Sequence, residues 1–138
     1  QAPDLLLQAP ALHPTSGHAE EQGEIAAYNM AGVETEYEGA VPLFSTGVYD
    51  IGVVTAGITQ PSAKLEEVSR FSSHESLYRR FLLQKSRLVG AIVMGKRLDR
   101  KVLKAQVKKA VLKMVDVDTT KTDLLREDFD FNSLLRGT

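Results

Sequence analysis

The residues of this sequence that could support acid–base or metal chemistry are few. The sequence has three histidines: His13, His18 and His74. No two of them have the i, i+4 spacing that would place two imidazoles on one face of a helix, as a metal pair requires. Asp128 and Asp130 are close in sequence, but they alternate with two phenylalanines, a pattern typical of a turn with apolar anchors. We therefore expect no catalytic residue and no metal site in this chain.

Several other chemistries are excluded by what the sequence lacks. It contains no cysteine, which removes disulfides, dithiol redox centres, iron–sulfur clusters and thiolate zinc sites. It also contains none of the glycine-rich phosphate loops, no His-Glu-x-x-His zinc motif and no serine in a nucleophile elbow. Nothing in the residue types therefore indicates a self-contained active site.

Composition and charge are those of an ordinary globular protein. The 138 residues are 43% hydrophobic, and 17 Lys and Arg against 18 Asp and Glu leave a formal charge of −1. No apolar run approaches the roughly 20 residues that a membrane-spanning helix needs. The first residues lack the basic and apolar regions of a signal peptide, which favours a cytoplasmic chain with no membrane partner. Because the sequence begins with glutamine, we expect it to lie inside a longer polypeptide.

A basic stretch from Lys96 to Lys121 holds nine Lys or Arg and three Asp. On the helix expected there, Lys101, Lys104 and Lys108 lie opposite the apolar stripe, where an amphipathic helix normally carries its charges. No aromatic residue interleaves with them, and the whole chain is slightly acidic. A solvated helix face is favoured, with nucleic-acid or anionic-surface binding as the weaker alternative.

The amino-terminal third is expected to hold one helix. Residues 1–14 carry three prolines and predict an irregular loop. The next segment predicts a helix over 16–30, with Ser16 as its N-cap, two glutamates in its first turn and Gly32 as its stop. Its expected packing face comprises Ala19, Gln22, Ala26 and Met30. The acidic residues 33–42 indicate a boundary.

The remaining residues predict a sheet and one long helix. Strands are expected over 43–49, 51–58, 64–71, 77–83 and 87–94, and the last two form a hairpin around Gln84-Lys85-Ser86. The 87–94 strand is apolar on both faces, which predicts a central position. An amphipathic helix is expected over 98–115, with Leu103, Val107, Ala110 and Met114 buried. A shorter helix at 122–127 and an anchored tail at 129–135 complete the expected elements.

Three motifs in one order resemble a known family. They are AEEQGEIAAYNMAG (Ala19–Gly32), then Tyr37-x-Gly39-x-x-Pro42, then RLVGAIVMGK (Arg87–Lys96). This order resembles the end of the FAD domain and the following domain in FAD-dependent pyridine nucleotide-disulfide oxidoreductases. The branch that it is most similar to contains NAD(P)H–nitrite reductase flavin domains and rubredoxin reductase. The resemblance runs from Ala2 to about Lys96.

The resemblance implies an α+β fold with an antiparallel sheet of about four or five strands flanked by helices. Residues 1–33 would be the remnant of an FAD-binding domain that ends with its last helix, and residues 40–138 would be the C-terminal interface or dimerisation domain. The parent would pass hydride from NAD(P)H to FAD and electrons to an acceptor. This chain alone would be non-catalytic, would hold no cofactor and would serve packing and interface roles.

The resemblance also implies which residues face the flavin in the parent. The positive end of the 17–30 helix would point at the pyrimidine edge, with the backbone amides of His18 and Ala19 towards the ring and Gln22 behind them. His13-Pro14-Thr15 with the following glutamates is similar to the His-Pro-Thr-x-x-Glu motif of disulfide reductases. Its position in the FAD domain assigns His13 no catalytic role.

Two kinds of partner follow from the resemblance: the missing FAD- and NAD(P)H-binding part of the polypeptide, and a second copy in a homo-oligomer. No nucleic-acid partner is expected. The alternative interpretation is a free-standing α+β interaction or scaffold module without enzymatic activity. Intact mass would separate the two, because a truncated enzyme comes from a product much heavier than 15.2 kDa.

Overall fold

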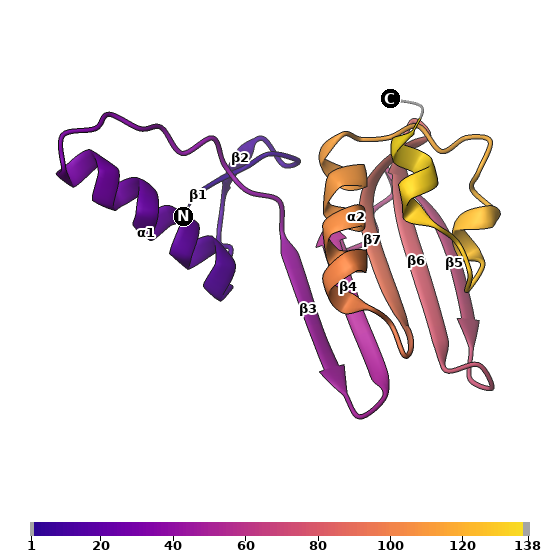
Figure 1. Ribbon diagram of the computed structural model, residues 1–138. Helices are drawn as coiled ribbons and strands as arrows, with labels where there is room; N and C mark the ends of the chain where they lie inside the picture. Colours follow the sequence, from indigo (N-terminus) through magenta and orange to yellow (C-terminus); the bar gives the residue numbers. More distant parts are fainter. Residues whose placement is uncertain (1, 137–138) are drawn as a thin grey trace. The chain divides into compact units, whose positions relative to one another are not determined.

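The computed structural model describes residues 2–136, whose elements are drawn in Figure 1. Contacts between residues divide the chain into two compact units, with the division between Pro42 and Leu43. Each unit is described by itself below. None of the helices within residues 2–136 is long and apolar enough to cross a bilayer.

The first unit begins with a small hairpin where an irregular loop was expected. Strands β1 (Ala2–Asp4) and β2 (Ala9–Ala11) pair antiparallel, so the loop prediction for residues 1–14 is wrong. Pro3 and Pro10 occupy the same rung of this ladder. Proline cannot donate a ladder hydrogen bond, which is why the prolines concealed the strands in the sequence. The paired prolines remove donors at only one rung, so a short hairpin persists.

Helix α1 (Ser16–Met30) has the predicted bounds but differs in its cap and its packing face. The N-cap is Thr15, one residue before the expected Ser16, and no acidic residue lies in the first turn. Gly32 follows the helix with a φ of 81°, as the predicted stop requires. The less exposed face comprises His18, Gln22 and Ile25; the predicted Ala19, Ala26 and Met30 are exposed.

The second unit is built on a five-stranded antiparallel sheet, within the predicted range of four or five strands. In chain order the strands are β3 (Leu43–Val48), β4 (Ile51–Gly57), β5 (Glu66–Ser72), β6 (Leu77–Gln84) and β7 (Arg87–Lys96). In the sheet their order is β3-β4-β7-β6-β5, which gives β7 the predicted central position (Figure 1). The predicted α+β fold is confirmed.

The β6–β7 hairpin turns on Lys85 and Ser86, as the sequence predicted. Both residues have positive φ values, 49° and 63°, because a two-residue turn must follow the right-handed twist of its strands. Gln84 pairs with Arg87 directly across the turn. A β-bulge at Leu82/Leu83 then shifts the pairing of β6 with β7 by one residue.

Helix α2 (Arg100–Leu112) packs on β3, β4 and β7. Asp99 caps it by accepting a hydrogen bond from the backbone N–H of Val102 at 3.1 Å. Val107 and Ala110 are fully buried as predicted, but Met114 is 39% exposed and the prediction for it is wrong. The helix ends at Leu112 with Lys113 as its C-cap, and Met114 turns into the left-handed region with a φ of 43°. Because the helical period stops there, Val115 is buried in place of Met114.

Two short 3₁₀ helices, η1 (Asp123–Leu125) and η2 (Phe131–Leu135), follow α2 in place of the expected helix and tail. Buried Arg79 on β6 holds this segment, because its guanidinium donates to the carbonyl oxygens of Leu124 at 3.0 Å and Glu127 at 2.8 Å. Its carbon Cζ also lies 5.8 Å from the centre of the Phe131 ring. Burial lowers the pKa of Arg79, and the nearby Glu127 carboxylate partly opposes that shift.

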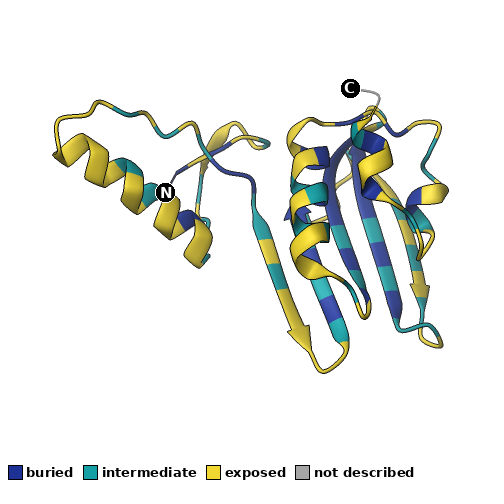
Figure 2. Ribbon diagram, in the orientation of Figure 1, coloured by how far each residue is buried: buried dark blue, intermediate teal, exposed yellow. Residues whose placement is uncertain are grey.

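The sheet of the second unit is covered on one face. Along most of β4 and β6, buried residues alternate with half-buried ones (Figure 2). Successive side chains of a strand point to opposite faces of the sheet, so one face is buried and the other is half-buried. The buried set faces α2 and the 3₁₀ helices, where Val54, Phe81 and Val93 form the core with α2 and Phe131. The other face is covered by no helix of residues 43–136.

Candidate functional site

The three residues predicted to face a ligand lie at the start of α1. His18 is buried and Gln22 is half-buried one turn later, so these two side chains share a face. Ala19 lies on the neighbouring exposed surface, and its backbone N–H donates to Thr15 O at 3.1 Å. The structure thus brings His18 and Gln22 together and separates the Ala19 side chain from them.

A hydrogen bond fixes the ring of His18. Its Nδ1 atom and the hydroxyl oxygen of Thr15 are 2.9 Å apart. Thr15 thereby contributes to the helix start through a side chain, although its hydroxyl caps no backbone N–H. The N-terminus of a helix carries partial positive charge, and this end of α1 has that character.

Behind His18 lies a buried pair that the sequence did not reveal. The ring of His13 meets the ring of His18 edge to face, with centroids 5.0 Å apart. His13 Nε2 is 3.7 Å from Asp4 Oδ2, and both side chains are at most 1% exposed. The other oxygen of Asp4 accepts from the backbone N–H groups of Leu6 and Leu7, both at 2.9 Å. The β1–β2 turn therefore holds a carboxylate against the imidazole next to α1.

The signal for Asp4 was present in the sequence. An aspartate whose side chain accepts from backbone N–H groups two and three residues later is a common start of a turn. We did not use this signal, because residues 1–14 were predicted to be an irregular loop. The Asp4 turn indicates a hairpin only when strands are expected on both sides of it. His13 carried no comparable local signal, since its partner Asp4 is nine residues away.

These residues do not form a metal centre. No group of three or more His, Cys, Asp or Glu within residues 2–136 is placed to hold a metal ion. The arrangement presents a helix N-terminus backed by two imidazoles, which suits a ligand with developing negative charge.

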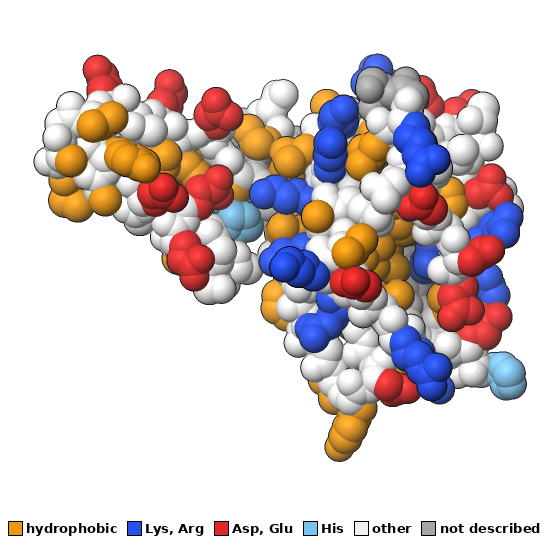
Figure 3. Space-filling model, in the orientation of Figure 1, with side chains coloured by type: hydrophobic (Ala, Val, Ile, Leu, Met, Phe, Trp, Pro, Cys, Tyr) orange, Lys and Arg blue, Asp and Glu red, His pale blue; other side chains and the backbone are white. Residues whose placement is uncertain are grey.

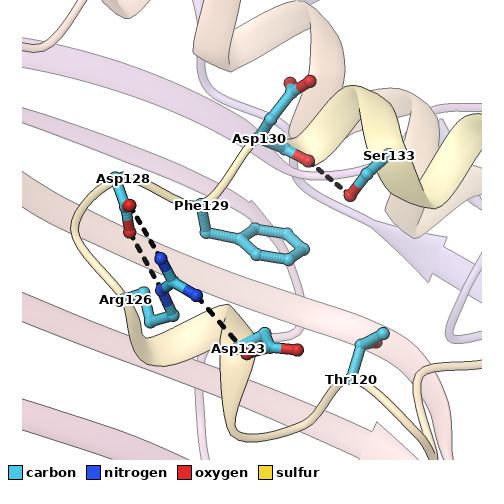
Figure 4. A pocket seen from close by; sticks show the side chains of 7 residues that line it. All are labelled: Thr120, Asp123, Arg126, Asp128, Phe129, Asp130 and Ser133. Atoms are coloured by element: carbon cyan, nitrogen blue, oxygen red, sulfur yellow. Dashed lines mark hydrogen bonds and ion pairs between the residues drawn. The ribbon is translucent and has the colours of Figure 1, made fainter.

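A hollow lies beside the 3₁₀ helices, and Figure 4 shows the residues that line it. Arg126 makes two hydrogen bonds to the Asp128 carboxylate, at 3.0 and 2.8 Å, and lies 4.0 Å from Asp123. The hydrogen bonds from Arg126 lower the pKa of Asp128. The Ser133 hydroxyl donates to the backbone carbonyl of Asp130 at 2.6 Å. The charged groups of this hollow already bind one another, and these contacts stabilise the turn between the two 3₁₀ helices.

The uncovered sheet face carries an apolar surface. Cross-strand partners share a face, so the register places Met94 beside Val53 and Tyr78, with Phe71 next to Tyr78. Phe71 is 70% exposed and is joined at the opposite edge by Phe44, which is 51% exposed. We call the following residues the open sheet face: Phe44, Val48, Ile51, Val53, Phe71, Tyr78, Ile92 and Met94. Polar residues interrupt this surface, since the same register places Thr55 and Arg80 beside Ile92. Large exposed apolar residues gathered on one face are typical of a packing or interaction site.

The glycine of the LVGA motif has a structural role. A Cβ atom at Gly90 would lie 1.7 Å from the carbonyl oxygen of Ile58, so no side chain fits there. That approach lets the Ile58 N–H donate to Val89 O at 3.0 Å beyond the end of β4. The motif therefore holds the chain after β4 against the central strand.

Comparison with known families gives one match. The model of the rubredoxin NAD+ reductase C-terminal domain matches residues 42–111, which is half of the chain. Among curated proteins, nitrite reductase [NAD(P)H] from Bacillus subtilis (strain 168) is 30% identical over 76 residues. That match covers 54% of this chain and 9% of the relative, so the chain spans a small part of that protein.

Three solved structures share the fold. An NAD-dependent persulfide reductase from A. fulgidus matches with a TM-score of 0.66 at 16% identity, over 86% of this chain and 24% of the other. The covalent putidaredoxin reductase–putidaredoxin complex matches with a TM-score of 0.67 at 21% identity, over 96% and 30%. An FAD-dependent pyridine nucleotide-disulphide oxidoreductase from Desulfovibrio vulgaris matches with a TM-score of 0.63 at 16% identity, over 96% and 36%.

Proposed function

Because the chain belongs to the rubredoxin NAD+ reductase C-terminal domain family, we propose that it works as the C-terminal part of an FAD-dependent NAD(P)H oxidoreductase. The parent passes hydride from NAD(P)H to FAD and electrons to an acceptor. This chain contributes the last helix of the FAD-binding domain in residues 1–33 and an interface domain in residues 40–138. The observation that carries the proposal is the family match over residues 42–111. The helix α1, which precedes the matched residues, adds an N-terminus suited to an anionic ligand edge.

The residues proposed to meet the flavin are His18, Ala19 and Gln22. FAD supplies the redox chemistry when bound, since its ring accepts hydride. The first-turn amides up to His18 and the N-terminal dipole of α1 favour the negative charge of a reduced ring. The Ala19 N–H is already bonded to Thr15 O, so Ala19 contributes mainly by lacking a bulky side chain on the exposed surface. Gln22 follows His18 on the less exposed side of the helix and supplies an amide.

Asp4 and His13 support this helix start from behind. The buried carboxylate of Asp4 faces His13, and the His13 ring contacts the ring of His18. Together with the Thr15 hydroxyl they hold the His18 side chain in one orientation. In this proposal they position His18 and do not react themselves.

The open sheet face serves the packing role. Its apolar residues are covered by no helix of the second unit, although burial there would stabilise the domain by about 25 cal/mol for each Å² removed from water. We assign this face to the FAD- and NAD(P)H-binding part of the parent, with a second copy in a homo-oligomer as a further partner. No nucleic acid or membrane has a role in this proposal, and the parent works in the cytoplasm.

Two measurements test the proposal. The natural gene product, purified from its source, should have an intact mass far above 15.2 kDa and the yellow colour of a flavoprotein. This chain alone should purify colourless, because it lacks the glycine-rich loops that bind the FAD and NAD(P)H phosphates. A natural product of this size without flavin would contradict the proposal and support a free-standing scaffold module. Stoichiometric FAD on this chain would contradict its assignment as a fragment without cofactor.

A further inference from the structure

A hollow of the second unit lies between the first turns of α2 and strand β3, and most of its charge is positive. Its volume is about 470 Å³, within the range of roughly 300–1,000 Å³ that is typical of small-molecule sites. We call it the α2 hollow, and its lining residues are Ser45, Leu98, Asp99, Arg100, Lys101 and Lys104. Figure 3 shows Lys and Arg side chains gathered over α2. The hollow thus combines cations from the helix with a hydroxyl from the strand.

The cations of the α2 hollow are not neutralised by the unit that carries them. Among residues 43–136, no ion pair joins Arg100, Lys101 or Lys104 to a carboxylate. The hollow beside the 3₁₀ helices differs in this respect, because Arg126 there is bound by Asp128. Of the two hollows, the α2 hollow is therefore the one with cations left to bind a ligand.

One carboxylate, that of Asp99, also lines the α2 hollow. Its Oδ1 atom accepts a hydrogen bond from the backbone N–H of Val102 at 3.1 Å, so it already serves as the cap of α2. Three cationic side chains and one carboxylate leave the lining with two positive charges in excess. The excess is the charge that a dianion would neutralise.

The crowding of cations is unfavourable for the helix itself. Lys104 lies four residues from both Arg100 and Lys108, and like charges at that spacing destabilise a helix. Arg100 and Lys101 lie in the first turn, where the helix dipole disfavours positive charge. A bound anion would reduce both effects, because it would attract the same cations.

Two glycines give the side chain of Arg100 its place on the sheet. Gly47 on β3 and Gly52 on β4 are cross-strand partners. A Cβ atom at Gly52 would lie 3.0 Å from Arg100 Cγ, and one at Gly47 would lie 3.0 Å from Arg100 Cζ. The stem of Arg100 therefore crosses Gly52, and its guanidinium lies over Gly47. A cation that is already positioned loses less entropy when a ligand binds.

We propose that the α2 hollow binds the phosphate group of a small anionic ligand. A phosphate monoester carries a charge of about −1.5 to −2 at pH 7, which matches the excess of the lining. The planar fork of Arg100 can donate to two phosphate oxygens, and the two lysines add compact positive charges. Ser45, half-buried on the facing strand, supplies a hydroxyl donor.

Other anionic partners fit the α2 hollow less well. A single carboxylate would neutralise half of the excess charge. A nucleic acid normally stacks its bases on aromatic side chains, and none of the residues in 43–136 that line the hollow is aromatic. The inference goes beyond the proposed function and does not depend on flavin binding.

Titration of the 138-residue chain, followed by the backbone amide signals in NMR spectra, tests the inference. Inorganic phosphate and glycerol 3-phosphate are added separately at low salt. The amides of residues 45 and 98–104 should shift saturably at millimolar ligand, and salt should weaken the binding because it screens exposed charges. Saturable binding of either compound supports the inference, and the tighter of the two distinguishes free phosphate from a phosphate ester as the ligand.

A pair of charge variants separates this site from general attraction to α2. Arg100→Gln/Lys104→Gln should weaken phosphate binding at least tenfold. Lys108→Gln/Lys109→Gln removes the same charge from the same helix outside the lining and should change the affinity less than threefold. Circular dichroism confirms that each variant is folded.

A variant that keeps every charge tests the placement of Arg100. In Gly47→Ala the new methyl group must displace the guanidinium, which is the end of a flexible side chain, so the fold should persist. Phosphate binding should weaken at least threefold. Thr46→Ala, at the next residue on the opposite face of the strand, should bind like the wild type.

Four results would each overturn the inference. They are the absence of saturable shifts at residues 45 and 98–104, an equal loss in the Lys108 and Lys109 control, unchanged binding by Gly47→Ala, and shifts spread over the lysines of the whole chain, which would show an adventitious ion only. None of them would bear on the flavin proposal, which the mass and colour of the natural product test.

Discussion

At the scale of single residues, Gly90 is the position where the backbone leaves least room. We expect Gly90→Ala to lower the free energy of unfolding by about 3 kcal/mol or more, because the Ile58 carbonyl must move away from the new methyl group. Urea unfolding followed by circular dichroism measures the change.

The matched control lies on the same strand. A Cβ atom at Gly95 would meet its nearest atom, Leu98 Cδ2, at 3.6 Å, an ordinary contact distance. Gly95→Ala should therefore cost less than about 1 kcal/mol. Equal effects of the two substitutions would show that loss of glycine, and not the approach of Ile58, decides the stability.

Asp118 makes the stability of the second unit depend on pH. Hydrogen bonds from Lys121, at 3.1 Å, and from the Ser86 hydroxyl, at 3.0 Å, lower the pKa of Asp118. A lowered carboxyl pKa contributes stability above the pKa of the unfolded chain, and this contribution is lost as the pH falls through the folded value. The urea midpoint of Asp118→Ala should lie below that of the wild type near neutral pH, and the difference should vanish in strong acid. A difference that grew towards acid pH would contradict this sign.

At the scale of elements, helix α2 depends on its buried stripe. Val107 is fully buried, so Val107→Asp should destabilise the protein by several kcal/mol, because an unpaired charge would enter the core. Lys101→Asp should be neutral or slightly stabilising, because it places a negative charge in the exposed first turn. Thermal unfolding compares the two, and similar losses would contradict the orientation of the helix.

The sequence predicted the elements of the second unit well because their patterns are local. The alternating and continuous apolar runs identified all five strands, and the apolar β7 strand was correctly placed at the centre. Of the predicted stripe, Val107 and Ala110 are buried and Leu103 is half-buried. The prediction failed at Met114, where the helix had already ended and the backbone reversed. A spacing rule cannot detect that end, because no glycine or proline marks it.

The predictions for the first unit were weaker because its structure depends on residue pairs that no apolar periodicity reveals. The β1–β2 hairpin is hidden by its prolines, and the Asp4–His13 pair joins the end of β1 to the segment that follows β2. The α1 packing face was placed on small residues, whereas His18 is the residue that the structure buries. Sequence spacing cannot rank a histidine above alanine as a buried residue unless its partners are known.

At the scale of the whole molecule, the two units should differ in local stability. Only His18 is buried on α1, whereas β7 is buried along most of its length. Native-state hydrogen exchange should therefore show the amides of residues 25–30 much less protected than those of residues 88–93. Equal protection would show that the two units unfold together. The measurement uses the complete chain and needs no substitution.

The buried guanidinium of Arg79 determines when the second unit can finish folding during synthesis. Its acceptors are the carbonyl oxygens of Leu124 and Glu127, which are translated more than forty residues after it. A nascent chain that ends before them has the sheet sequence but no acceptors for this cation, so water must remain on that face of β6. The sheet can therefore lose that water only when residues 124 to 127 have left the ribosome. A message that stops before them should yield a product for degradation and not a shorter working domain.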